Sequence, residues 1–156
     1  MTIRRLLPIA ALLATVALIG CGSSGSSQPS ASDAKTAYAP LRVQIVAIGG
    51  SIGAAITAAN RETDVQLESA FSALAARGRA AVARLDSLKV PDSLVAKRDA
   101  LRDAIDKGTG DLSDIATAAR AHDAAAARTA AEQLVSDSQQ IGTARAAFES
   151  ALNSAK

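Results

Sequence analysis

Apolar side chains recur along most of this 156-residue chain at alternating spacings of four and three residues. Such spacing places one apolar stripe on one face of an α-helix, whereas a half-buried strand would alternate at every second residue. The stripe of one segment is unbroken and consists of Leu67, Phe71, Leu74, Gly78, Ala81, Leu85 and Leu88. A helix with one apolar face must bury it against other elements, so the pattern predicts an all-α fold.

Three further segments have stripes of the same kind. The first comprises Tyr38, Leu41, Ile45, Ile48, Ile52, Ala55 and Ala59. The third comprises Leu94, Leu101, Ile105, Gly108, Leu112, Ile115 and Ala119, and the fourth comprises Leu134, Ile141, Phe148 and Leu152. Alanine is abundant and β-branched residues are few, which also favours helix over strand. Four stripes joined by short connections predict an antiparallel up-down-up-down four-helix bundle.

The ends of these segments carry helix start signals. Thr63 and Gln66 have the spacing of a capping box. Pro91 disfavours helix in the residue before it and suits a helix start, and Asp123 suits an N-cap. Pro40 indicates that the first helix either begins there or is kinked after a short leading turn. We expect one domain, residues 33–156, with helices at about 33–60, 64–89, 92–121 and 124–154.

The first 20 residues have the order of a secretory signal peptide. Arg4 and Arg5 precede an uncharged apolar run of 15 residues, 6–20. A membrane-spanning helix needs about 20 apolar residues, so this run is short for a permanent span. We therefore expect residues 1–20 to be removed from the mature chain.

The end of the apolar run, Leu18-Ile19-Gly20-Cys21, resembles the lipobox of bacterial lipoproteins. In that motif an aliphatic residue stands three places before a cysteine, and a small residue stands directly before it. The resemblance implies that a signal peptidase recognises Leu18, Ile19 and Gly20 and cuts before Cys21. It also implies a diacylglyceryl group on the sulfur of Cys21, which can be alkylated as a thiolate, and it allows a further acyl chain on the new amino group. The alternative is an uncleaved anchor helix with an incidental cysteine.

Lipidation would hold the mature protein at the outer face of the cell membrane, or in an outer membrane where the host has one, because two or three acyl chains anchor stably. Gly22 to Ser32 has no large apolar or charged residue, so residues 21–32 are expected to be the lipidated cysteine and a flexible tether with a reach of about 18 Å. The chain has 17 Lys and Arg against 15 Asp and Glu, and removing Arg4 and Arg5 makes these numbers equal. This balance gives no indication of a nucleic-acid partner.

The remainder of the chain resembles the small alanine-rich helical lipoproteins of bacteria with GC-rich genomes. The resemblance rests on its composition, on the Val90-Pro91 break and on the Ala121-His122-Asp123 turn. It implies a helical fold and no particular activity.

Glycines inside the expected helices need an explanation, since each costs about 1 kcal/mol of helix stability relative to alanine. Gly49 and Gly53 have a GxxxG spacing in the first segment, and Gly78 and Gly108 lie on the stripes of the second and third. Close approach of a neighbouring helix is one interpretation. A cavity that admits an apolar ligand is the second, and a kink or local unwinding is the third.

The first segment also has a membrane-spanning interpretation, because Arg42 and Arg61 bracket 18 uncharged residues. Its glycines and polar side chains make it only weakly hydrophobic, and its stripe matches those of the other segments. We therefore expect a helix of the bundle.

Residues suited to catalysis or metal binding are scarce. The single histidine, His122, falls in a predicted turn, and Ala119 stands where a di-iron bundle would need glutamate. Cys21 is the single cysteine, and no phosphate-binding loop of the GxxxxGK[ST] type is present. We expect no catalytic residue, no metal and no cofactor other than the lipid on Cys21.

These features predict a lipid-anchored, non-enzymatic binding or scaffold module that engages another envelope protein through a helix face. The alternative is a carrier or sensor of a small apolar ligand or lipid in a cavity of the bundle. An enzyme is the third hypothesis, and it is disfavoured because no nucleophile, base and orienting group can be assembled from the residues present.

Overall fold

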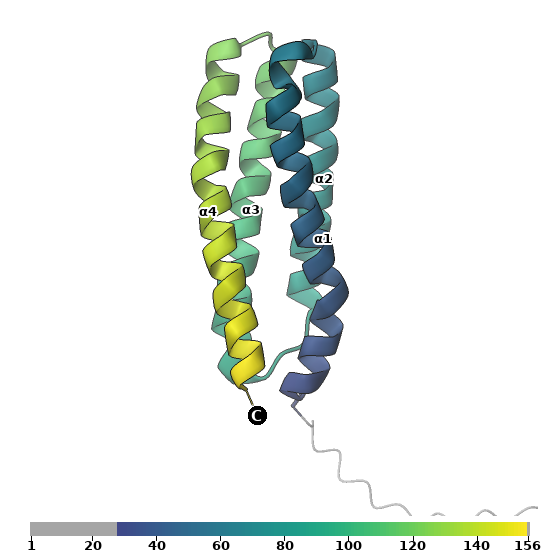
Figure 1. Cartoon of the computed structure of the whole chain (residues 1–156), viewed down its shortest axis with the longest axis vertical. Helices are drawn as coiled ribbons and strands as arrows, with labels where there is room; N and C mark the ends of the chain where they lie inside the picture. The colour runs from purple at the N-terminus through teal and green to yellow at the C-terminus, as the bar shows by residue number, and fades with distance from the viewer. Residues whose placement is uncertain (1–27, 156) are drawn as a thin grey trace, which may run out of the picture.

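The computed structural model describes residues 28–155, which form four long helices. These are α1 (Ala31–Ala58), followed by the short 3-10 helix η1 (Ala59–Arg61), α2 (Asp64–Ser87), α3 (Asp92–Arg120) and α4 (Ala124–Ser154). The helices run alternately up and down, and each packs against the next in the chain, so that α4 returns beside α1 (Figure 1). The predicted all-α four-helix bundle is confirmed.

The expected signal peptide and the lipobox residues Leu18, Ile19, Gly20 and Cys21 lie outside the described residues. Ser30 is the N-cap of α1, because its hydroxyl oxygen accepts the backbone N–H of Asp33 at 3.1 Å. The helix therefore begins at Ala31, and the last two residues of the expected tether belong to it.

Pro40 lies inside α1 on its exposed side, so the helix does not begin there.

The predicted caps of α2 and α4 are confirmed. The backbone N–H of Thr63 donates to Oε1 of Gln66 at 2.8 Å, and the backbone N–H of Gln66 donates to Oγ1 of Thr63 at 3.4 Å. Oδ1 of Asp123 accepts the backbone N–H groups of Ala125 and Ala126. These bonds satisfy N–H groups that have no partner within their own helix, which fixes where each helix starts.

The stripes meet in one apolar core. Its most enclosed large side chains are Leu85, Leu101, Leu134 and Phe148, with no measurable exposure. The rings of Tyr38 and Phe148 meet edge to face, with centroids 5.0 Å apart, and join α1 to α4. Such a pair contributes about 1 kcal/mol beyond the area that it buries.

Helix α1 is unusual because it is apolar and yet poorly enclosed. It is the one described helix that is long and apolar enough by composition to cross a membrane, but only 22% of its most apolar window is buried. In the structure α1 packs against α2 and α4, but less extensively than α3 packs against α2 and α4. Val43 is 69% exposed and Val46 is 52% exposed.

Candidate binding site

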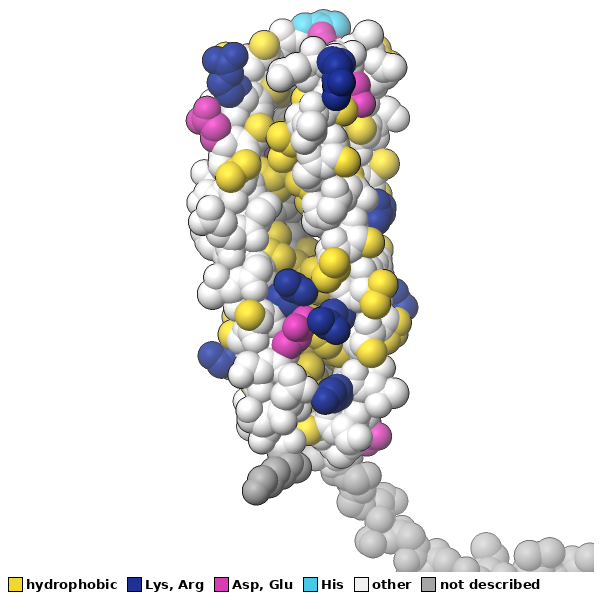
Figure 2. Space-filling view, viewed as in Figure 1, with side chains coloured by type: hydrophobic (Ala, Val, Ile, Leu, Met, Phe, Trp, Pro, Cys, Tyr) yellow, Lys and Arg dark blue, Asp and Glu magenta, His cyan; other side chains and the backbone are white. Residues whose placement is uncertain are grey.

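An apolar groove lies between α1 and α4, where the bundle is least closely packed; we call it the α1–α4 groove. Its middle section has a volume of about 90 Å³ and is lined by Ile45, Ile48, Gly49, Ile52, Ile105, Ser138 and Ile141. Figure 2 shows apolar side chains in a hollow between the two helices. Ile45, Ile48, Ile52 and Ile105 are themselves buried, with 6 to 9% exposure, and Ile141 is half-buried, so this section is a narrow opening onto the core.

Small and apolar residues form the edges of this section. A Cβ atom at Gly49 would meet no atom within 4 Å, so nothing covers α1 there. Oγ of Ser138 donates to the backbone oxygen of Leu134 at 2.7 Å, which satisfies the hydroxyl within α4. Val46 and Val135 stand three residues before Gly49 and Ser138, on the same sides of their helices, and each is 52% exposed. The groove thus offers apolar contacts on both edges.

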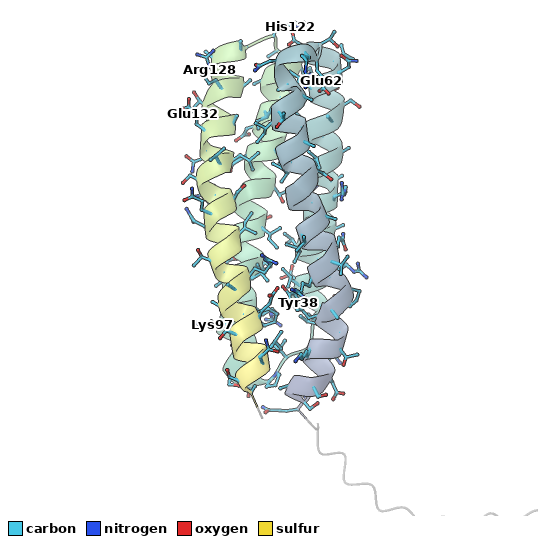
Figure 3. The ribbon with its side chains drawn as sticks, viewed as in Figure 1. Tyr38, Glu62, Lys97, His122, Arg128 and Glu132 are labelled. Carbon is cyan, nitrogen blue, oxygen red and sulfur yellow. The ribbon has the colours of Figure 1, made fainter. Side chains whose placement is uncertain are left out.

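The far end of the groove lies farther along α1 and α4, at the end of the bundle that carries the α3–α4 turn, and shares no lining residue with the middle section. A cavity of about 470 Å³ there has Phe71 and Ile115 among its apolar lining and His122 at its rim. His122 lies in the turn, as predicted, and its backbone is left-handed with φ of 56°. Its Nδ1 lies 2.5 Å from Oδ2 of Asp64, which ties the turn to the start of α2. Figure 3 shows His122 at this far end of the bundle.

Basic side chains gather at the opposite end of the groove, near the start of α1 and the end of α4. Nε of Arg42 donates to Oε1 of Glu149 at 3.1 Å, and Nη1 of Arg145 lies 3.7 Å from the same oxygen. The hydroxyl of Tyr38 donates to this oxygen at 3.5 Å. Burial, followed by the charge of Glu149, raises the pKa of Tyr38 to about 12, so the hydroxyl remains a donor. Lys35 lines an adjoining cavity of about 330 Å³.

Two of the predicted glycines lie where helices approach closely. A Cβ atom at Gly78 of α2 would collide with Oγ1 of Thr109 on α3. A Cβ atom at Gly108 of α3 would lie 3.0 Å from Cδ1 of Ile141 on α4. Close approach is confirmed at both positions. The cavity interpretation is wrong for these two glycines, because neighbouring atoms already occupy the space.

The other two predicted glycines behave differently. Gly49 and Gly53 are exposed on α1, and a Cβ atom at either would meet nothing within 4 Å. Close approach of a neighbouring helix is therefore wrong for both. Gly49 nevertheless lines the groove, which is consistent with the cavity interpretation. Gly78 and Gly108 do not line it.

A buried pair of carboxyl groups between α3 and α4 was missed by the sequence analysis. Oδ1 of Asp137 accepts Nζ of Lys107 at 2.9 Å and the side-chain amides of Gln133 and Gln140 at 3.3 and 3.2 Å. Burial raises the pKa of Asp111 to about 6, supported by its hydrogen bond to Asp137. Burial alone would raise the pKa of Asp137 as well, but hydrogen bonds from Lys107, Asp111 and Gln133 outweigh it and lower that pKa.

A shared proton explains these opposite shifts. Oδ2 of each carboxyl group is buried and accepts no hydrogen bond from a described donor. A proton held by Asp111 and donated to Asp137 satisfies both groups. One signal could have found Asp137: it follows Leu134 by three residues and precedes Ile141 by four, which is the spacing of the stripe.

Within residues 28–155, no three His, Cys, Asp or Glu side chains gather closely enough to hold a metal ion. Asp111 and Asp137 line none of the groove sections described above. The α1–α4 groove has a basic end, an apolar middle and a wide far end. Comparison with protein-family models, with curated proteins and with solved structures gave no match.

Proposed function

We propose that this chain is a lipid-anchored, non-enzymatic binding protein of the bacterial envelope, and that the α1–α4 groove is its binding surface. The observation that carries the proposal is the poor enclosure of α1, which leaves Val43 and Val46 exposed beside a groove lined by the buried Ile45, Ile48 and Ile52. Contiguous exposed apolar surface on a folded domain marks a site of interaction.

The direction of the helices supports the anchoring part of the proposal. α1 begins and α4 ends at the same end of the bundle (Figure 1). The segment that contains Cys21 therefore joins the bundle at the basic end of the groove. Under this proposal that end lies nearest the membrane, and the His122 turn lies farthest from it, about 45 Å away along the 31 residues of α4.

Native mass spectrometry of the full chain, exported by a bacterial host and released from lipid nanodiscs, tests whether the groove is occupied. We expect an extra mass that disappears on denaturation. Gly49→Leu should remove it, because a leucine at this position lies over the middle section. Gly50→Leu is the matched control, since Gly50 is an adjacent exposed glycine with equally open surroundings and does not line that section. A ligand-free mass for the wild type would contradict a small-molecule role for the groove.

An envelope protein that docks on α1 beside the basic end of the groove, where Val43 lines the adjoining cavity, is the second candidate. The exposed Val43, on a segment without charge between Arg42 and Arg61, favours it. A photo-crosslinking amino acid at position 43 should give one adduct of fixed mass in cells. The control is position 65, because Val65 of α2 is equally exposed, at 73%. Equal crosslinking from both positions would count against a specific partner.

A further inference from the structure

We propose that the α1–α4 groove holds one acyl chain of a single-chain anionic lipid, with the head group at Lys35, Arg42 and Arg145. The proposal rests on the proposed function, because it uses the same groove, and it adds the chemical class of the ligand. It follows from the charge of one end of the groove, the shape of the middle and the charge of the other end.

The basic end has more positive charge than its own residues neutralise. Arg42 and Arg145 share the single carboxylate of Glu149. Lys35 lines the adjoining cavity and forms no ion pair with any described residue. The side chains of Arg42 and Arg145 are 57% and 32% exposed, so a ligand can reach both guanidinium groups. Guanidinium groups bind carboxylate and phosphate oxygens with charge-assisted hydrogen bonds, so an anionic head group complements this end.

The middle section fits a single hydrocarbon chain. Its lining is apolar apart from Ser138, and the hydroxyl of Ser138 is already bonded within α4. A section of about 90 Å³ is narrow for two chains side by side. From Arg42 to Ile56 the groove extends about 21 Å along α1, whereas an acyl chain in one leaflet spans about half of a 30 Å hydrocarbon core. One chain with its head group at the basic end therefore fills the middle section and ends about 6 Å short of Ile56.

The far end sets the direction of the ligand. Asp64 and Asp123 are at the rim of that cavity, together with His122 and Arg128. Asp64 already binds His122, and Asp123 caps α4, so this end has no excess of positive charge to attract an anion. The methyl end of the acyl chain consequently lies towards Phe71 and Ile115, and the head group lies at the basic end.

Photolabelling of the full lipidated chain in phosphatidylcholine nanodiscs tests the ligand class. Three probes carry a diazirine in the same 16-carbon chain: palmitate, lysophosphatidylglycerol and the neutral methyl ester of palmitate. We expect at least one of the two anionic probes to label peptides that contain Ile48 and Ile141 about fivefold more than the ester does. The stronger anionic probe identifies the head group as carboxylate or phosphate.

Variants separate the head group from the tail. Lys35→Gln combined with Arg42→Gln should lower anionic labelling about tenfold and leave ester labelling unchanged. Lys97→Gln is the control, because Lys97 is an exposed lysine near the same end of the bundle but on α3 and outside the groove (Figure 3). Gly49→Leu should remove labelling by every probe, and Gly50→Leu should not. Circular dichroism checks that each variant keeps its helical content.

Two results would overturn the proposal. If the ester labels the groove as strongly as both anionic probes and Gly49→Leu still abolishes labelling, the groove binds apolar ligands without regard to charge, and only the anionic class is wrong. If no probe labels the groove peptides, or if Gly49→Leu has no effect, the proposed function of the groove fails as well.

Discussion

At the scale of single residues, Gly78 and Gly50 are two helical glycines in opposite surroundings. We expect Gly78→Ala to lower the free energy of unfolding by about 1 to 3 kcal/mol, because the new methyl group collides with Thr109. Thr109 cannot move freely, since its hydroxyl donates to the backbone oxygen of Ile105 at 2.8 Å. Gly50→Ala should raise the free energy of unfolding by about 1 kcal/mol, since its surroundings are open. Chemical denaturation followed by circular dichroism measures both.

A second substitution identifies the cause of the Gly78 effect. Thr109→Ala in the Gly78→Ala background removes the colliding hydroxyl and should recover part of the lost stability. A Gly78→Ala variant as stable as the wild type would show that α2 and α3 do not approach as closely as described.

Asp111 makes the stability of the bundle depend on pH. Its pKa in the folded state, about 6, lies above the ordinary value for aspartate, so folding favours the protonated form. This contribution to stability is complete below about pH 4 and is lost as the pH rises through 6. Asp111→Asn keeps a donor towards Asp137 at every pH. We expect it to raise the free energy of unfolding at pH 8 by about 1 to 2 kcal/mol and to reduce the difference between pH 5 and pH 8.

Thermal unfolding at the two pH values provides the measurement. Asp106→Asn is the control, because Asp106 is an exposed aspartate of the same helix. An Asp111→Asn variant with the same pH dependence as the wild type would refute the shared proton.

At the scale of whole helices, the sequence predicted the four long helices because each helix buries one face, and the buried face appears in the sequence as an apolar stripe. Position relative to the stripe also distinguishes Gly78 from Gly49. Gly78 lies on a stripe between Leu74 and Ala81, whereas Gly49 lies one residue after the stripe residue Ile48. This offset agrees with the exposure of Gly49 in the structure, and the sequence analysis did not use it.

The openness of the groove could not be predicted in this way. A stripe shows which side of a helix faces the core, but not how far the helix stands from its neighbours. The basic cluster was missed for a related reason. Lys35 and Arg42 are each more than 100 residues away from Glu149 in the sequence. They come together only because α4 returns beside α1.

The loose packing of α1 predicts uneven local stability. We expect backbone amides of residues 47–57 in α1 to exchange hydrogen at least about tenfold faster than those of residues 101–112 in α3, because fewer packed contacts hold α1. Hydrogen–deuterium exchange with mass spectrometry of the full chain measures the ratio. Equal protection of both segments would mean that α1 opens only when the whole bundle unfolds.

At the scale of the whole molecule, the resemblance of Leu18-Ile19-Gly20-Cys21 to a lipobox predicts the mass of the mature chain. The chain purified from bacterial membranes should begin at Cys21 and exceed the mass of residues 21–156 by the attached acyl groups. Cys21→Ser should remove the acyl groups and leave an uncut chain, because the expected peptidase acts on the lipidated cysteine. Intact-mass spectrometry distinguishes these forms. A wild-type chain that retains residues 1–20 and has no added mass would contradict the lipid anchor.

The α1–α4 groove also has a consequence for biosynthesis, since it joins the first described helix of the chain to the last. A ribosome completes α1 long before it makes α4, so the isoleucines of α1 have no partner on that side until the final helix exists. Incomplete chains expose apolar surface that chaperones and proteases recognise. Under the proposed function, a chain truncated before α4 lacks the binding surface and also exposes apolar side chains that chaperones and proteases recognise, so we expect only finished molecules to bind a ligand.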